Sequence, residues 1–444
     1  MNKQIRSLMA LLLGAACFLI SCQGNNSASK DGIPELKEAK AGMAPKEEYD
    51  NIRLKYTQAK DGLQKNPADL KQYLTLATVF ILEGRISGEG TYYGNAAIAM
   101  LNKVLDNPAA NTDQVFEAYS LKSTVLLNMH QFKDAKAVAL KGIALNPYNS
   151  GIFGALIDAD VELGQYDSAV ANCDKMLSLR PDLRSYSRAS YLRQIHGDNR
   201  GAIEAMKLAV EAGLPGAEQT EWARVTTGDL FMNVGSIDTA EILYKMSLVY
   251  RPHYPFAEIG LAKVAKARKQ YDTAIVHAEA AIKVMSDPAF IALLADVYEL
   301  KGDPQKAASI REAILKGMKE GLEDEKEAPV KHNANRELAQ AYLSMGQTDE
   351  AYKYAKADLE LRPDNIDANE LMAWVLFLKK DYAGAKPYAE KMMREKTQNA
   401  TTLYKAAAIY ASAGDAARAN TLKQASAAIS PYVDEQVKMC AGNF

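Results

Sequence analysis

Alanines recur at regular intervals along most of this 444-residue chain, and their spacing constrains the fold more than any other feature of the sequence. Each alanine lies early in a stretch with helical periodicity. In several stretches a proline follows twelve residues later, as in QYDSAVANCDKMLSLRPD. The steps between the alanines are 33, 34, 38 or 44 residues, which indicates a repeated unit of about 34 residues. The aligned alanines are Ala97, Ala135, Ala169, Ala202, Ala240, Ala274, Ala307, Ala351, Ala385 and Ala419.

Three further positions keep the same register and predict two helices per unit. Twelve residues before the alanine a small residue is usual, with Ile157 as the exception, so that the two helices can approach closely. Five residues before it a glycine often ends the first helix, where a left-handed backbone is needed. The proline twelve residues after it stops the second helix. The small residues are Ser123, Ser190, Gly228, Ala262, Ala295, Ala339, Ala373 and Ala407, and the glycines are Gly164, Gly197, Gly235, Gly302, Gly346 and Gly414.

This pattern resembles the tetratricopeptide repeat family from Ala68 to Pro431. The resemblance implies an all-α fold, a right-handed α-solenoid of about ten helix–turn–helix repeats. In that family the first helix of each repeat lines a concave groove that holds a partner protein or peptide segment. The chain departs from the pattern at extra residues within 85–95, at an insertion around 316–333, and at Pro387, which should kink a helix.

The first residues resemble a bacterial lipoprotein signal. Lys3 and Arg6 precede a thirteen-residue apolar run that is too short to span a bilayer. The run ends in Leu-Ile-Ser-Cys, a lipobox pattern, so Cys22 is the predicted lipidation site, with an ordinary cleaved signal as the alternative. The predicted segments are a signal peptide (1–21), a flexible tether (22–45), an N-terminal capping helix (46–67), the solenoid (68–431) and a C-terminal cap (432–444).

The sequence contains no recognisable catalytic or metal-binding motif, and we therefore expect that the protein is not an enzyme. Its five histidines are scattered, and His130 and His196 are interpreted as residues of the turns between helices. No phosphate-binding loop or nucleophile–base pair is found. The formal net charge is −2, which gives no basic field for nucleic acid. We therefore expect no cofactor, no metal and no nucleic-acid partner.

The groove positions of the first helices supply the candidate binding residues. Arginine, tyrosine and tryptophan dominate interface hot spots. A competing interpretation is that Arg184 pairs with a nearby acid and that Trp222 packs between repeats. The Lys and Asn residues with which some family members clamp a C-terminal carboxylate are missing. The candidates are Asp158, Glu162, Arg184, Arg188, Tyr191, Trp222, Asp229, Trp374 and Phe377.

The resulting hypothesis is a membrane-anchored scaffold for protein–protein interactions at the bacterial cell envelope. An N-terminal lipid would attach it, most simply to the outer membrane facing the periplasm. The alternative is a lipoprotein that captures a peptide or glycan for an outer-membrane importer, with Tyr92 and Tyr93 beside Trp222 as its best support.

Overall fold

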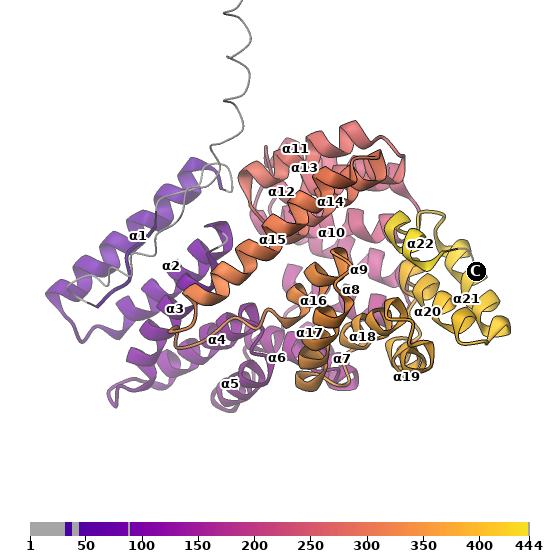
Figure 1. Ribbon diagram of the computed structural model, residues 1–444. Coiled ribbons are helices and arrows are strands. Elements are labelled where there is room, and N and C mark those ends of the chain that lie inside the picture. Colours follow the sequence, from indigo (N-terminus) through magenta and orange to yellow (C-terminus); the bar gives the residue numbers. More distant parts are fainter. Residues whose placement is uncertain (1–31, 38–43, 88, 443–444) are drawn as a thin grey trace, which may run out of the picture. The chain divides into compact units, whose positions relative to one another are not determined.

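A computed structural model of the chain describes residues 32–37, 44–87 and 89–442 (Figure 1). The chain divides into two units, Met1–Leu36 and Lys37–Phe444, and the second contains every helix described here. The predicted signal peptide, Cys22 and most of the tether lie outside the described residues. The helices are α1 (Lys46–Lys65), α2 (Leu70–Ser87), α3 (Gly90–Leu105), α4 (Thr112–Asn128), α5 (Phe132–Leu145), α6 (Ser150–Glu162), α7 (Tyr166–Leu179), α8 (Leu183–Ile195), α9 (Asn199–Glu211), α10 (Glu218–Asn233), α11 (Ile237–Tyr250), α12 (Pro255–Ala267), α13 (Tyr271–Val284), α14 (Pro288–Lys301), α15 (Pro304–Asp324), α16 (Asn335–Ser344), α17 (Thr348–Leu361), α18 (Ile366–Leu378), α19 (Tyr382–Met392), α20 (Ala400–Ser412), α21 (Ala416–Ile429) and α22 (Glu435–Ala441).

The helices pack in consecutive antiparallel pairs from α2–α3 to α20–α21, which confirms the predicted all-α solenoid of helix pairs. All ten aligned alanines lie in the second helix of a pair, and all are buried. Gly228 occupies the position of a first helix where a small residue is usual. A Cβ atom added there would lie 2.5 Å from the Tyr244 ring. The alanine spacing therefore marks where the helices of a pair touch.

The turn inside each pair explains the glycine positions. Six of these turns contain a glycine with a positive φ angle, and each such glycine was predicted from the spacing. In three others a larger residue adopts the same left-handed backbone, which costs about 1–2 kcal/mol for a residue with a Cβ atom. Those three residues are His130 (φ 55°), Lys269 (φ 59°) and Lys380 (φ 64°).

Both departures from the repeat length are absorbed by longer helices. The extra residues within 85–95 extend α2 and α3. Helix α15 has 21 residues where α13 has 14, and residues 325–334 then form a loop before α16. Pro387 lies inside α19, which has 11 residues. The insertions therefore leave the pairing of helices unchanged and lengthen individual helices.

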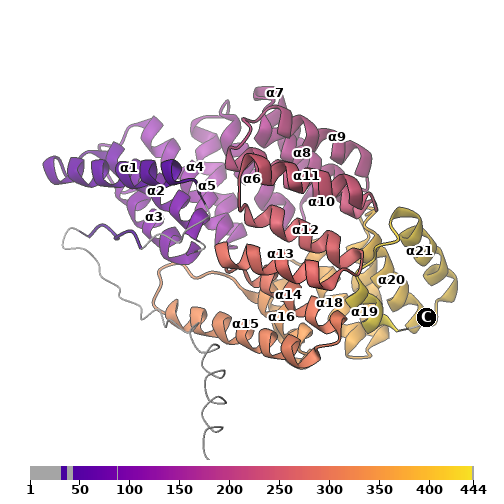
Figure 2. The same cartoon turned by 90° about the horizontal axis from the view of Figure 1, so that it is seen from above.

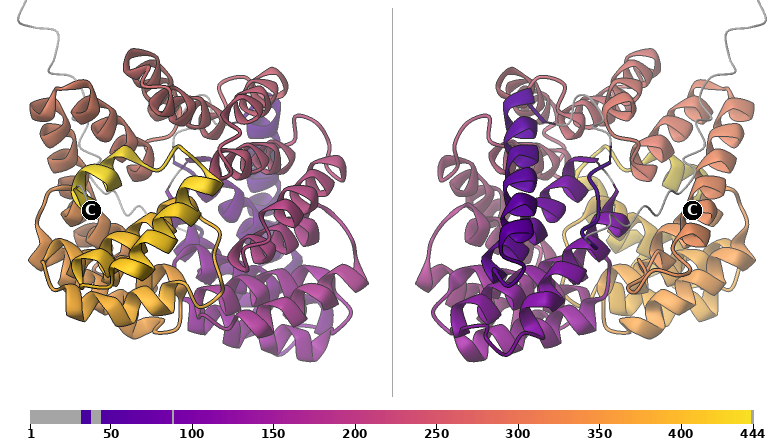
Figure 3. Two further views of the ribbon diagram at one scale, coloured as in Figure 1. Left: turned by 90° about the vertical axis from the view of Figure 1, so that its right-hand side faces the viewer. Right: turned by 90° about the vertical axis from the view of Figure 1, so that its left-hand side faces the viewer.

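Turns that are about 200 residues apart meet within the second unit, because the stacked pairs follow a curved path (Figures 2 and 3). The Ile366 N–H donates to the Tyr166 hydroxyl (2.9 Å), and the Asn365 amide donates to the Val161 carbonyl (3.2 Å). The Arg394 guanidinium donates to the Gly164 carbonyl (2.5 Å). The turn between α6 and α7 thus rests against the turn between α17 and α18, and we call this contact the closure.

The outermost helices also contact distant repeats. In α22 the Gln436 amide donates to Glu299 of α14 (3.0 Å), and Asp434, immediately before α22, lies 3.3 Å from Lys266 of α12. In α1, Glu48 forms an ion pair with Arg251 (3.2 Å). In the described part of the chain, no helix combines the length and the apolar character needed to cross a membrane.

Candidate functional site

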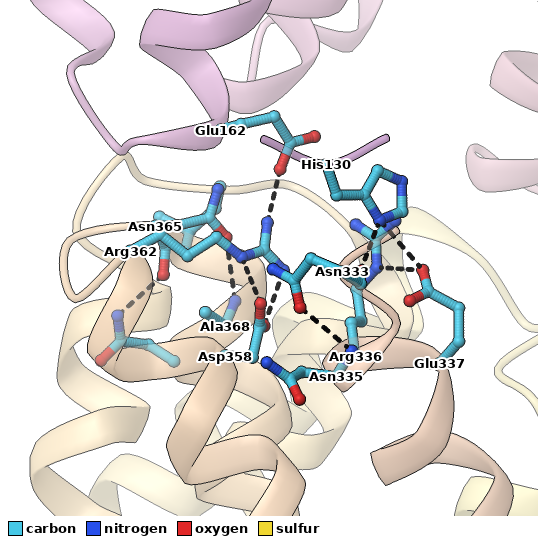
Figure 4. A network of polar contacts seen from close by, with 12 residues as sticks. His130, Glu162, Asn333, Asn335, Arg336, Glu337, Asp358, Arg362, Asn365 and Ala368 are labelled. Carbon is cyan, nitrogen blue, oxygen red and sulfur yellow. Dashed lines mark hydrogen bonds and ion pairs between the residues drawn. The ribbon is translucent and has the colours of Figure 1, made fainter. Parts of the chain in front are cut away.

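The closure is centred on Arg362, whose side chain is almost completely buried (1% exposed) (Figure 4). Its guanidinium donates in bidentate fashion to Asp358 of α17 (2.8 and 2.7 Å) and also pairs with Glu162 at the end of α6. A planar guanidinium suits this fork geometry, and its fixed charge compensates two carboxylates at once. Arg362 therefore joins two distant parts of the solenoid.

Beside the closure, the first helices of several pairs line two adjoining cavities. The larger, of about 860 Å³, is bordered by α14, α16, α18 and α20 and includes Trp374 and Lys405. The smaller, of about 250 Å³, lies between α8 and α18 and includes Tyr191. Asp367 and Glu370 of α18 line both cavities. We call the two cavities together the interior groove.

The carboxylates of α18 give the interior groove an acidic character. Glu370 accepts hydrogen bonds from Lys405 and Thr402 (2.7 Å each). Among the described residues, none forms a hydrogen bond or ion pair with Asp367. Desolvation by the surrounding protein, together with the charges of Glu370 and Glu162, raises the pKa of Asp367 to about 6. Asp367 is thus a mostly ionised group at neutral pH that has no direct ion-pair partner among the described residues, although the charges of Arg362 and Arg336 partly offset the increase in its pKa.

Several sequence-predicted residues lie around this groove. Tyr191 is 43% exposed and faces the smaller cavity. Glu162 borders the closure through its pair with Arg362. Asp158 forms an ion pair with Arg188 (2.6 Å). Among the described residues, Arg184 has no such acidic partner. Trp374 lines the larger cavity although it is only 8% exposed.

The remaining predicted residues lie elsewhere or are buried. Phe377 is packed in the hydrophobic core, where its ring stacks on Trp374 at 4.8 Å. Arg184 is exposed near the start of α8 and borders a separate hollow beside α10. Asp229 accepts hydrogen bonds from Tyr244 (2.9 Å) and Lys263 (3.1 Å) in another cavity. Trp222 is 37% exposed on α10. The nine candidates therefore do not form one continuous site.

Two histidines that the sequence separates by 202 positions lie at one end of the larger cavity. The rings of His130 and His332 have centroids 4.5 Å apart, and His130 Nδ1 lies 3.9 Å from Glu337 Oε1. Burial lowers the pKa of both histidines, so the neutral imidazoles predominate at pH 7. Sequence reasoning interpreted His130 as a turn residue. It occupies the turn, and it also faces the loop formed by the insertion.

The groove contains carboxylates, Lys405, Arg336, aromatic rings and neutral imidazoles, and its smaller cavity, whose described lining residues include acidic but no basic side chains, suits a polar or cationic group. Cys173 belongs to a buried hydrophobic cluster, and burial raises the pKa of its thiol to about 11, which disfavours the reactive thiolate.

One family model agrees with a helix pair of this chain. The tetratricopeptide repeat model matches residues 337–365, which cover most of α16 and all of α17. No curated protein matches the sequence at a significant level. A solved tetratricopeptide repeat protein from Parabacteroides merdae is 17% identical, with 59% of this chain and 99% of that chain covered and a TM-score of 0.39.

Two other solved structures have similarly low sequence identity and TM-scores. PilW, a type IV pilus biogenesis factor, is 16% identical, with 46% of this chain and 94% of that chain covered and a TM-score of 0.39. Human IFIT1 with m7Gppp-AAAA is 16% identical, with 84% of each chain covered and a TM-score of 0.45. Because these TM-scores are below 0.5, the description of the fold as stacked helix pairs rests on the repeats of this chain and not on these structures.

Proposed function

We propose that this tetratricopeptide-repeat protein is a non-catalytic scaffold that binds a segment of a partner protein in its interior groove. The observation that carries the proposal is Asp367, a carboxylate that both cavities share and that forms no ion pair within the described part of the chain. Among the described residues that line the smaller cavity, two are acidic and none is lysine or arginine. Such a surface favours a partner segment with a lysine, an arginine or a free amino group.

Tyr191 and Asp367 give this proposal a specific geometry. They come from α8 and α18, and they face the same cavity from opposite sides of the closure. An exposed tyrosine provides apolar contact area at low entropic cost, while the carboxylate supplies a charge-assisted hydrogen bond. We infer that the aliphatic stem of a lysine or arginine packs on the ring while its charged end reaches Asp367.

The first prediction concerns partner capture from solubilised envelopes. Asp367→Asn should reduce the recovery of a groove-bound partner about tenfold at pH 7.5, the order expected for losing one charge-assisted contact. Recovery by the wild type should also fall as the pH is lowered through 6, because Asp367 becomes protonated, whereas recovery by Asp367→Asn should change little. Quantitative mass spectrometry of the captured proteins provides the measurement.

Two controls make this test specific. Asp134→Asn removes an exposed acid from the first turn of α5, outside both cavities, and should leave recovery unchanged. A photo-crosslinking amino acid in place of Tyr191 should label the same partner, while one in place of the exposed Tyr148 should not. If Asp367→Asn recovers the same proteins as the wild type, the groove is not the binding surface. Selective loss of a glycan or free peptide would favour the capture alternative.

We also propose that a lipid on Cys22 attaches the scaffold to the cell envelope, most simply to the outer membrane facing the periplasm. The lipobox pattern at Leu19–Cys22 supports this assignment. Metabolic labelling with an alkyne-bearing fatty acid should mark the wild type but not Cys22→Ala, which should move from the membrane fraction to the soluble fraction. A wild-type protein that acquires no label would disprove the anchor.

A further inference from the structure

We propose that His130, His332 and Glu337 form a binding site for a divalent transition-metal ion such as Zn²⁺. One ligand atom from each residue lies within 4.8 Å of the other two. Two imidazoles and one carboxylate are a ligand set that Zn²⁺ accepts, with bonds of about 2.0–2.2 Å. Small rotations of the three side chains would bring the ligand atoms to the roughly 3.4 Å separation that tetrahedral coordination with such bonds requires.

The backbone holds both histidines in position before any ion binds. The Gln131 side chain donates to the Lys331 carbonyl (2.7 Å), and the Asn333 N–H donates to the Met129 carbonyl (3.1 Å). These two bonds tie the residues on either side of His332 to those on either side of His130. The His332 N–H also donates to Glu325 (3.2 Å). The loop at 325–334 is therefore docked in register on the α4–α5 turn.

His130 occupies its turn against the local preference of the backbone. Its φ angle of 55° falls at the position where six other pairs have glycine. A histidine there incurs a cost that a glycine would avoid. Contacts of the imidazole offset that cost: Nδ1 donates to the Asn333 carbonyl (3.0 Å), and the ring lies 4.5 Å from that of His332. This hydrogen bond leaves Nε2 as the nitrogen that can bind a metal ion.

Glu337 has unused bonding capacity at the same place. Among the described residues, none donates a hydrogen bond to its buried Oε2 atom. Its Oε1 atom lies 3.1 Å from Nε of Arg336, which compensates the carboxylate charge when no cation is bound. A divalent ion would take over this compensation and use the unsatisfied oxygen.

All three residues line the larger cavity, so a fourth coordination position would open towards it. The ion would join the α4–α5 turn, helix α16 and the inserted loop at 325–334. It would leave one coordination position for water or for a group of a bound molecule. This inference does not depend on the identity of the partner or on Asp367.

The test uses the tag-free full-length protein in mild detergent, with ZnCl₂ as the probe in titration calorimetry and CoCl₂ in visible absorption. The wild type should bind one Zn²⁺ per chain, gain thermal stability from it, and give the visible bands of tetrahedral Co²⁺. His130→Gly should weaken Zn²⁺ binding at least tenfold, the order seen when a metal site loses one supporting group. His332→Gln should have the same effect.

The matched control is Lys269→Gly, which places a glycine at the equivalent left-handed position of the turn between α12 and α13. It relieves the same backbone cost and removes no proposed ligand, so its Zn²⁺ affinity should equal that of the wild type. Because glycine suits this turn, His130→Gly is expected to fold, and circular dichroism checks that it does. Equal Zn²⁺ affinity in the wild type and in His130→Gly, or no stoichiometric binding by the wild type, would overturn the proposal.

Discussion

Replacing Gly164 with alanine is expected to destabilise the protein far more than the same change at Gly346 or Gly414, two turn glycines with open space around them. Gly164 has a φ angle of 73°, which costs an alanine about 1–2 kcal/mol. A Cβ atom at this position would also lie 2.2 Å from the carbonyl carbon and oxygen of Asp364 and 2.7 Å from the Asn365 nitrogen. Those are backbone atoms, which cannot rotate away, so the closure must separate to accommodate the methyl group.

Gly414 and Gly346 are the matched controls for this prediction. Both end the first helix of a pair with a positive φ angle, but a Cβ atom at either would meet nothing within 4 Å. Gly414→Ala and Gly346→Ala should therefore show the backbone cost alone. Thermal unfolding measures the total effect, and hydrogen–deuterium exchange at the α17–α18 turn measures the local one. Equal losses of stability in the three variants, with no faster exchange at residues 364–368, would contradict the closure.

The repeats could be predicted from sequence because the contacts that define them are local. In α8 and α9, for example, the Ser190 hydroxyl donates to the carbonyl of Ala202, twelve positions later (2.7 Å), so both residues lie within one unit and their spacing is visible in the sequence. The turn glycines were found for the same reason. His130 and Lys269 show that the backbone conformation, rather than the residue type, is what the turn requires.

The closure could not be predicted from sequence, because it depends on small rotations that accumulate over many pairs. Glu162 and Arg362 are separated by 200 positions, and no repeat pattern relates the α6–α7 turn to the α17–α18 turn. The same curvature brings His130 to His332 and places Asp367 opposite Tyr191. The sequence thus predicted Tyr191 of α8 and Trp374 of α18 as groove residues, but it did not single out Asp367 and Glu370, the two acidic residues that both cavities share.

Phe377 illustrates a second limit. It lies three residues after Trp374 on a predicted first helix, and the sequence analysis named both as groove candidates. Helix α18 is packed on nearly all sides, with nine buried residues among its 13, so the same spacing instead produces a stacked pair inside the core. Helical spacing predicts which residues are neighbours, but the packing of adjacent pairs decides which of them reach the groove.

Replacing Arg362 with methionine should have the second large effect. The variant would leave Asp358, which is buried with only 3% of its side chain exposed, and Glu162 without their shared cation. Breaking a buried ion pair by removing one partner typically costs about 3–5 kcal/mol, because an uncompensated charge stays in the protein. The free energy of unfolding, measured with urea, should fall by that order.

An exposed pair provides the comparison for Arg362. Arg418 lies 3.8 Å from Glu390 with 46% of its side chain exposed, and Arg418→Met should cost no more than about 1 kcal/mol. The double variant Asp358→Leu, Arg362→Met should recover part of the stability, because it removes the stranded charge along with its partner. It should not restore slow hydrogen exchange at the α17–α18 turn, since Glu162 still lacks a cation there. A loss in Arg362→Met as small as that in Arg418→Met would show that the closure does not stabilise the solenoid.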